Sequence, residues 1–97
     1  MLNGKQRRYL RGLGHHLDAI VQVGKEGVSE GIAGALATAL EDHELVKIRL
    51  GEAVDRDRHE VAEELATTVE GELVQVLGRT ILIYRRRRKD PKIQLPR

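Results

Sequence analysis

The sequence predicts one small α/β domain with the element order α-β-α-β-α-β-β around a mixed four-stranded sheet. Three observations predict this class. The chain has 97 residues, enough for a single modest core. Segments with helical apolar spacing alternate with segments rich in β-branched residues, an order typical of strand–helix–strand units with right-handed crossovers. The last apolar segment folds back on itself at a glycine, which predicts a hairpin.

Residues 3–17 are predicted to form the first helix. Its apolar side chains recur at helical spacing: Tyr9, Leu10, Leu13 and Leu17. Gly12 and Gly14 weaken this helix, each by roughly 1 kcal/mol relative to alanine. We therefore expect the helix to depend on docking against the rest of the domain.

Residues 19–24 are predicted to form a strand buried on both faces, because the segment is almost continuously aliphatic. A glycine loop from Gly24 to Gly27 follows it. Ser29 is the predicted N-cap of the second helix, and Glu30 lies in the first turn, where the helix dipole favours an acid. The apolar stripe of this helix continues to about Asp42.

Residues 44–50 are predicted to form the second strand, with Lys47 and Arg49 on one face. The other face is apolar and comprises Val46, Ile48 and Leu50. The third helix is predicted over about residues 57–70, with Gly71 as its C′ stop.

Residues 73–85 are predicted to form a hairpin. Its two-residue turn is Gly78–Arg79, with glycine at the first position, which suits a type II′ turn. In this register the apolar pairs toward the main core are Val74 with Ile83 and Val76 with Ile81.

The net charge of +2 hides a separation of charge along the chain. Residues 1–12 carry four basic residues and no acid, residues 85–97 carry seven basic residues and one acid, and the segment between them has six basic and fourteen acidic residues. Because a protein that needs only solubility would intersperse its signs, this separation predicts a face toward a polyanion. We expect a domain over residues 1–85 and a basic tail over residues 86–97, with Ile93 and Leu95 at the sheet edge.

Residue types exclude several classes of site. The chain has no cysteine, which excludes disulfides and thiolate metal sites. Its four histidines lack metal-ligand spacing, and we expect His15 to be buried and hydrogen-bonded. No nucleophile lies beside a base, and no nucleotide-binding fingerprint is present. We therefore expect no catalysis, no metal and no cofactor.

Apolar and aromatic content narrows the location and the mode of recognition. The chain has no long apolar run and no apolar stretch after its basic N-terminus, so we expect neither a membrane span nor a signal peptide. We expect a cytoplasmic monomer. With two tyrosines and no Phe or Trp, the chain lacks the rings of a base-stacking platform. Recognition should rest on charge and shape, which favours folded RNA.

The loop between the first strand and the second helix has the sequence Gly-Lys-Glu-Gly. Glycine lets a ligand approach the main chain, the helix N-terminus offers unsatisfied N–H groups, and Lys25 adds a phosphate contact. KH domains use a loop of this form to clamp nucleic-acid backbone. The steric needs of a strand–helix joint would also explain these glycines.

Four separated blocks of the sequence resemble the YhbY family, the single-domain bacterial form of the CRM domain (chloroplast RNA splicing and ribosome maturation). They are KQRRYLRGLGHHLDAIVQVGKEGVSEGI, HELVKIRL, VQVLGRTILIYR and KIQLPR, and they cover nearly the whole chain. The resemblance implies a fold similar to the C-terminal domain of bacterial translation initiation factor three. It also implies binding of structured RNA, association with precursors of the large ribosomal subunit, and contact between the glycine loop and RNA. Glu26 departs from this expectation, because an acid there would repel phosphate unless it points away.

Two functions from different classes remain. The first is a non-catalytic RNA-binding protein that binds structured ribosomal RNA precursor in pre-ribosomal particles and assists assembly of the large subunit. The second is a protein-interaction module that docks a basic ribosomal protein through the acidic third helix. The residues predicted to contact RNA lie in the glycine loop, the first helix, the second strand and the tail: Gly24, Lys25, Glu26, Gly27, Lys5, Arg7, Arg8, Arg11, Lys47, Arg49, Arg85, Arg86, Arg87, Arg88 and Lys89.

Overall fold

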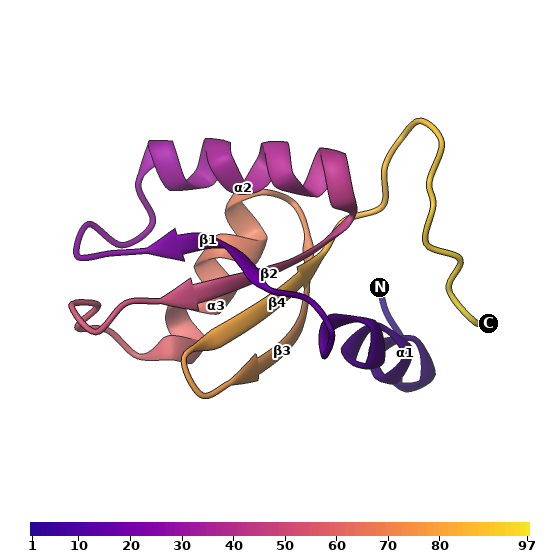
Figure 1. Cartoon of the computed structure of the whole chain (residues 1–97), viewed down its shortest axis with the longest axis horizontal. Helices are drawn as coiled ribbons and strands as arrows, with labels where there is room; N and C mark the ends of the chain where they lie inside the picture. Colours follow the sequence, from indigo (N-terminus) through magenta and orange to yellow (C-terminus); the bar gives the residue numbers. More distant parts are fainter.

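Seven elements follow one another in the predicted order in the computed structural model, which describes residues 1–97 (Figure 1). They are α1 (Gly4–Gly14), β1 (Ala19–Val23), α2 (Glu30–His43), β2 (Leu45–Leu50), α3 (Arg58–Thr68), β3 (Glu72–Leu77) and β4 (Thr80–Tyr84). The mixed four-stranded sheet is confirmed: β1 is parallel to β2, and β4 is antiparallel to both β2 and β3. The order β1-β2-β4-β3 places β1 and β3 at the edges. None of the helices has the length and apolar character needed to cross a membrane.

Helices cover the two faces of the sheet unequally. α2 and α3 pack on one face, where 15 buried residues form the main core. α1 packs on the opposite face against β2, β3 and β4, and it lies toward one end of the sheet beside both termini (Figure 1). The smaller cluster beneath α1 comprises Leu2, Leu10, Leu45, Val74, Leu82 and Tyr84.

Strand β1 is half buried, so the prediction that both of its faces are buried is wrong. Val21 and Val23 lie in the main core, but Ile20 is 56% exposed and Gln22 is also exposed. The reason is that β1 is an edge strand, and α1 packs on the other three strands. The alternation predicted for β2 is confirmed, with Val46, Ile48 and Leu50 all buried in the main core.

The hairpin contains an irregularity that the predicted register lacks. Val76 pairs with Ile81 as predicted, but Ile83 faces Leu73 instead of Val74. A register shift in β3 after Leu73 turns Val74 toward α1, where it joins the smaller cluster. The predicted pairing of Val74 with Ile83 is therefore wrong, because one extra residue in a strand moves its neighbours to the opposite face.

Positive φ angles mark the hairpin turn and the end of α3. Gly78 has a φ of 58°, which suits the predicted type II′ turn. After α3, Glu70 takes the left-handed conformation with a φ of 56°, so the prediction of Gly71 as the C′ stop is wrong. Glycine is needed at position 71 for a steric reason: an added Cβ would lie 2.9 Å from Ile83 Cγ2 and 3.2 Å from the Tyr84 carbonyl oxygen.

Helix α1 is shorter than predicted and ends at Gly14, which leaves Leu17 in the connection to β1. A capping box closes its N-terminus: the Gln6 N–H donates to Asn3 Oδ1 at 2.8 Å, and the Asn3 N–H donates to Gln6 Oε1 at 3.0 Å. Gly14 is buried against Leu82, where an added Cβ would lie 2.5 Å from Leu82 Cδ2. Glycine at this position therefore lets α1 approach the sheet closely.

The buried carboxylate of Glu44 holds the C-terminal tail. Glu44 lies between α2 and β2, is 1% exposed and has a φ of 64°. Its backbone carbonyl accepts a hydrogen bond from the Arg85 N–H at 2.8 Å. Its carboxylate accepts from the backbone N–H groups of three tail residues: Arg87 at 2.9 Å, Lys92 at 2.7 Å and Ile93 at 2.9 Å.

Residues 86–97 dock beside α1 as a result. Ile93 and Leu95 pack against the smaller cluster, not at the sheet edge where they were expected. The Gln6 side chain of α1 donates to the Pro96 carbonyl at 3.0 Å. The two termini thus lie at the same end of the molecule (Figure 1).

Burial raises the pKa of Glu44, but other effects lower it by more. They are the hydrogen bonds from the backbone N–H groups of Arg87, Ile93 and Lys92 and the positive charge of Arg87. The net pKa lies below the ordinary value of 4.5. Because the folded carboxyl has the lower pKa, its contribution to stability is fully present above about pH 4.5 and is lost as the pH falls through the folded value.

We predict that Glu44→Gln lowers the free energy of unfolding by about 1–3 kcal/mol near neutral pH, because an amide NH₂ cannot accept hydrogen bonds from the buried N–H donors. Between neutral and acid pH, the free energy of unfolding should also fall less for this variant than for wild type, because the variant has no carboxylate to protonate at position 44. Urea denaturation at about pH 7 and about pH 3.5 measures both effects. Glu52→Gln changes an exposed acid and should stay within about 0.5 kcal/mol of wild type. Equal stability of Glu44→Gln and wild type near neutral pH would contradict the role of this carboxylate.

Candidate nucleic-acid interface

The glycine loop and the basic terminal segments lie at opposite ends of the molecule. The loop after β1 forms one end of the long axis, which spans 38 Å, and α1 and the tail form the other end (Figure 1). The residues predicted to contact RNA are therefore not one compact cluster. Only a ligand that extends along the molecule can contact both ends at once.

The glycine loop is a closed turn with two free amides. The Gly27 N–H donates to the Gly24 carbonyl at 3.0 Å, and Gly27 has a φ of 69° that favours glycine. The N–H groups of Lys25 and Glu26 make no hydrogen bond within the chain, and both side chains are exposed. Ser29 caps α2, as predicted, by accepting from the Ile32 N–H at 3.2 Å.

The fold does not require glycine at position 24. An added Cβ there would meet nothing within 4 Å, and its φ is not left-handed. Gly27, by contrast, is explained by its backbone conformation. The bare backbone at Gly24 leaves the face of the turn open to a ligand.

Three of the predicted cations come together between α1 and the sheet. Arg8 and Arg11 of α1 and Lys47 of β2 line one cavity of about 360 Å³ that contains no acidic side chain. We call this cavity the basic hollow; its lining also includes Gly12, His15, Gln75 and Thr80. Arg49 is exposed and pairs with Thr80 in the strand register, so it lies beside the basic hollow on the same sheet. His15 is exposed, so the prediction of a buried, hydrogen-bonded histidine is wrong.

Two of the predicted arginines bind backbone carbonyls of the protein itself. The Arg7 guanidinium donates to the Leu73 carbonyl of β3. Arg85 is half buried and donates to the Val69 carbonyl at 2.9 Å and the Ala37 carbonyl at 3.2 Å. Arg85 also forms an ion pair with Glu41 at 3.2 Å.

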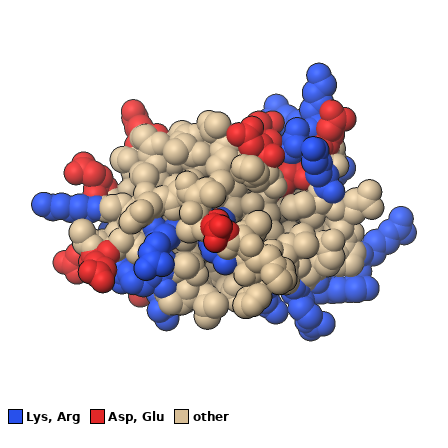
Figure 2. Space-filling model, in the orientation of Figure 1, with Lys and Arg blue, Asp and Glu red and all other residues tan.

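The remaining predicted cations lie on the surface. Lys5 is exposed on α1, and Arg86, Arg88 and Lys89 are exposed in the tail. Arg87 is half buried. In Figure 2, Lys and Arg stand without neighbouring acids at the lower right, over the α1 end, whereas both signs mix at the upper right and at the opposite end. The positive potential should therefore be strongest at the α1 end of the molecule.

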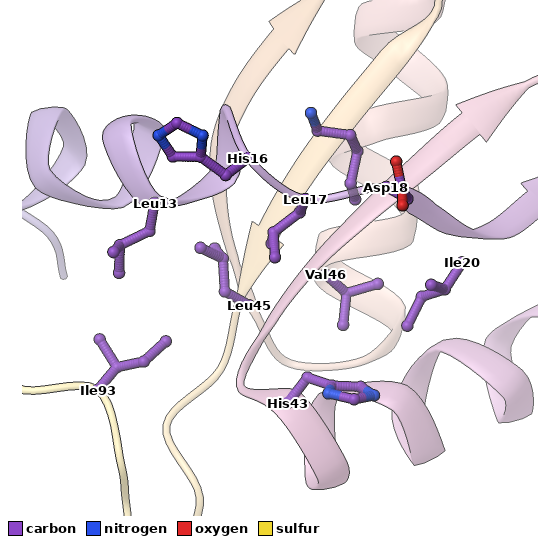
Figure 3. Close-up of a pocket in the computed structure, with 10 residues that line it drawn as sticks. Leu13, His16, Leu17, Asp18, Ile20, His43, Leu45, Val46 and Ile93 are labelled. Carbon is purple, nitrogen blue, oxygen red and sulfur yellow. The ribbon is translucent and has the colours of Figure 1, made fainter.

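An apolar hollow of about 500 Å³ adjoins the basic one, and sequence reasoning missed it. Lys47 lines both cavities. The apolar lining comes from α1, the connection after it, β1, β2 and the tail: Leu13, Leu17, Ile20, Leu45, Val46 and Ile93 (Figure 3). Leu13 and Leu17 belong to the apolar series predicted for the first helix, and each is 37% exposed here. The sequence carried no signal for this cavity, because it depends on where α1 ends and where the tail docks.

Residues 2–85 match the family model described as the CRS1/YhbY (CRM) domain. The chain therefore belongs to the CRS1/YhbY (CRM) domain family, which confirms the resemblance seen in the sequence blocks.

Relatives match along nearly the full chain. The probable RNA-binding protein YqeI of Bacillus subtilis is 42% identical over 96 residues, covering 99% of this chain and 100% of that protein. An RNA-binding protein of Haemophilus influenzae is 33% identical and covers 99% and 96% of the two chains. The solution structure of hypothetical protein SAV1595 from Staphylococcus aureus superimposes with a TM-score of 0.85 at 43% identity, covering 99% of this chain and 100% of that one.

We predict that two neighbouring arginines differ in their effect on stability. Arg85→Ala should lower the free energy of unfolding by about 1–3 kcal/mol, because it removes the half-buried hydrogen bonds to the Val69 and Ala37 carbonyls. Arg88→Ala changes an exposed side chain and should stay within about 0.5 kcal/mol of wild type. Thermal and urea denaturation of both variants measure the difference. A loss as large for Arg88→Ala as for Arg85→Ala would contradict this distinction.

Proposed function

We propose that this CRM-domain protein is a non-catalytic, cytoplasmic, monomeric RNA-binding protein that binds structured ribosomal RNA precursor and assists assembly of the large subunit. The observation that carries the proposal is a set of cations without salt-bridge partners, in the basic hollow and the glycine loop, in a domain whose relatives are named RNA-binding proteins. The chain has two salt bridges, Arg56–Glu64 and Arg85–Glu41. The cations of the basic hollow and of the loop form none.

The arrangement of these cations favours a folded RNA over an extended strand. The basic hollow, Arg49 on the sheet and Lys25 in the loop would contact phosphates at several points along the 38 Å axis. Aromatic stacking would contribute little, because Tyr84 is 4% exposed and lies in the smaller cluster, which leaves Tyr9, 42% exposed, as the single exposed tyrosine ring. Backbone charge and shape would therefore provide most of the affinity.

We predict binding to protein-free fragments of large-subunit ribosomal RNA that weakens steeply with salt. If about six phosphates are contacted, the affinity should fall by roughly 10³-fold between about 50 and 200 mM salt. Filter binding or fluorescence anisotropy across a salt series measures this slope. Absence of salt-sensitive binding would contradict the proposal and favour the docking of a basic ribosomal protein through α3.

In growing cells, cross-linking should join the protein to nucleotides of the large-subunit RNA.

We predict that Lys25→Ala weakens RNA binding several-fold and reduces the salt slope by about one. Its melting temperature should not change, because the side chain is exposed and forms no ion pair. Glu26→Gln is the companion variant: if Glu26 faces the RNA, removal of its charge should raise the affinity. If a folded Lys25→Ala variant bound RNA as tightly as wild type, the prediction that the glycine loop contacts RNA would be wrong.

A further inference from the structure

On the α1 side of the basic hollow, a glycine stands between two larger side chains. Arg8, Gly12 and His15 are spaced four and three residues apart, so they share one helix face. An added Cβ at Gly12 would meet nothing within 4 Å. Glycine is a poor residue for a helix interior, and neither packing nor backbone conformation requires it here. Its effect is to leave the helix side of the hollow open.

The sheet side of the hollow presents groups that can recognise more than charge. Gln75 of β3 makes no side-chain hydrogen bond within the chain, so its amide can both donate and accept. Thr80 Oγ1 donates to the Leu77 carbonyl at 2.7 Å, which leaves its lone pairs free to accept. A phosphate alone would need only the cations. An amide beside a hydroxyl matches the polar edge of a nucleobase.

The size and charge of the cavity suit one nucleotide. Its volume of about 360 Å³ lies in the range of small-ligand sites, roughly 300–1,000 Å³. Arg8, Arg11 and Lys47 are unpaired and can bind phosphate, and a guanidinium plane can stack on an unstacked base. We propose that the basic hollow receives one unpaired nucleotide of the bound RNA, with its phosphate at these cations and its base at Gln75 and Thr80. This inference rests on the proposed function and adds a preference for folded RNA that carries an extruded nucleotide.

The test compares two RNA hairpins that are identical except for one unpaired adenosine in the stem. Wild-type protein should bind the bulged hairpin about tenfold more tightly than the fully paired one in fluorescence anisotropy, as expected from contacts to a single base. Gly12→Leu fills the hollow without changing any charge or removing any contact. It should lose this preference, so that the bulged and the fully paired hairpins bind with equal affinity.

Gly34→Leu is the matched control. Gly34 is also an exposed glycine inside a helix, with nothing within 4 Å of an added Cβ, but it lies in α2 and outside the hollow. This variant should keep the full preference for the bulged hairpin. Gln75→Ala is a second test of the inference, because it removes the amide proposed to contact the base and leaves the cations in place. It should reduce the preference for the bulged hairpin by about tenfold at most.

The outcomes separate this inference from the proposed function. Equal, salt-dependent binding of both hairpins by wild type would overturn the inference and leave RNA binding intact. A preference that survives in both Gly12→Leu and Gln75→Ala would also overturn it. If wild type bound neither hairpin at any salt concentration, the proposed function and the inference would fail together.

Discussion

The hydrogen bonds that the Glu44 carboxylate accepts from the tail backbone determine much of what lies on the α1 side of the sheet. A carboxylate that is 1% exposed needs donors, and three N–H groups of the tail supply them. Once fixed, the tail places Ile93 and Leu95 against the smaller cluster and meets α1 through the hydrogen bond from Gln6 to Pro96. One buried acid thus links the end of α2, the start of β2 and the C-terminal segment that borders α1.

The sheet is covered unevenly, and the candidate interface lies on its less covered face. Two helices bury the main-core face, whereas α1 and the tail cover part of the other face. Lys47 and Arg49 belong to this second face, so they remain available although they lie within a central strand. A third long helix over this face would have buried them. The apolar and basic hollows are the space that α1 and the tail leave unfilled.

The sequence allowed the element order and sheet composition to be predicted, because apolar periodicity is a local property of the chain. It did not reveal the irregularity after Leu73 or the exposed Ile20, since both depend on contacts between distant segments. The left-handed Glu70 is a local feature that closes the end of α3, and residue type alone favoured the neighbouring Gly71 for it. Arg85 shows the same limit for charge. It looks like part of a basic run, yet its guanidinium binds carbonyls of α2 and of the segment after α3.

The candidate site was predictable as a set of cations but not as a cavity. Arg8, Arg11 and Lys47 were identifiable from charge alone, whereas their convergence requires α1 to dock on the sheet. The glycines of α1 make the point most clearly. By local propensity Gly12 and Gly14 are equivalent weaknesses in one helix, but in the folded chain they have opposite effects: Gly14 lets the helix contact Leu82, and Gly12 keeps the adjoining space empty. Packing against the sheet requires glycine at position 14 but not at position 12, and only the tertiary structure distinguishes the two positions.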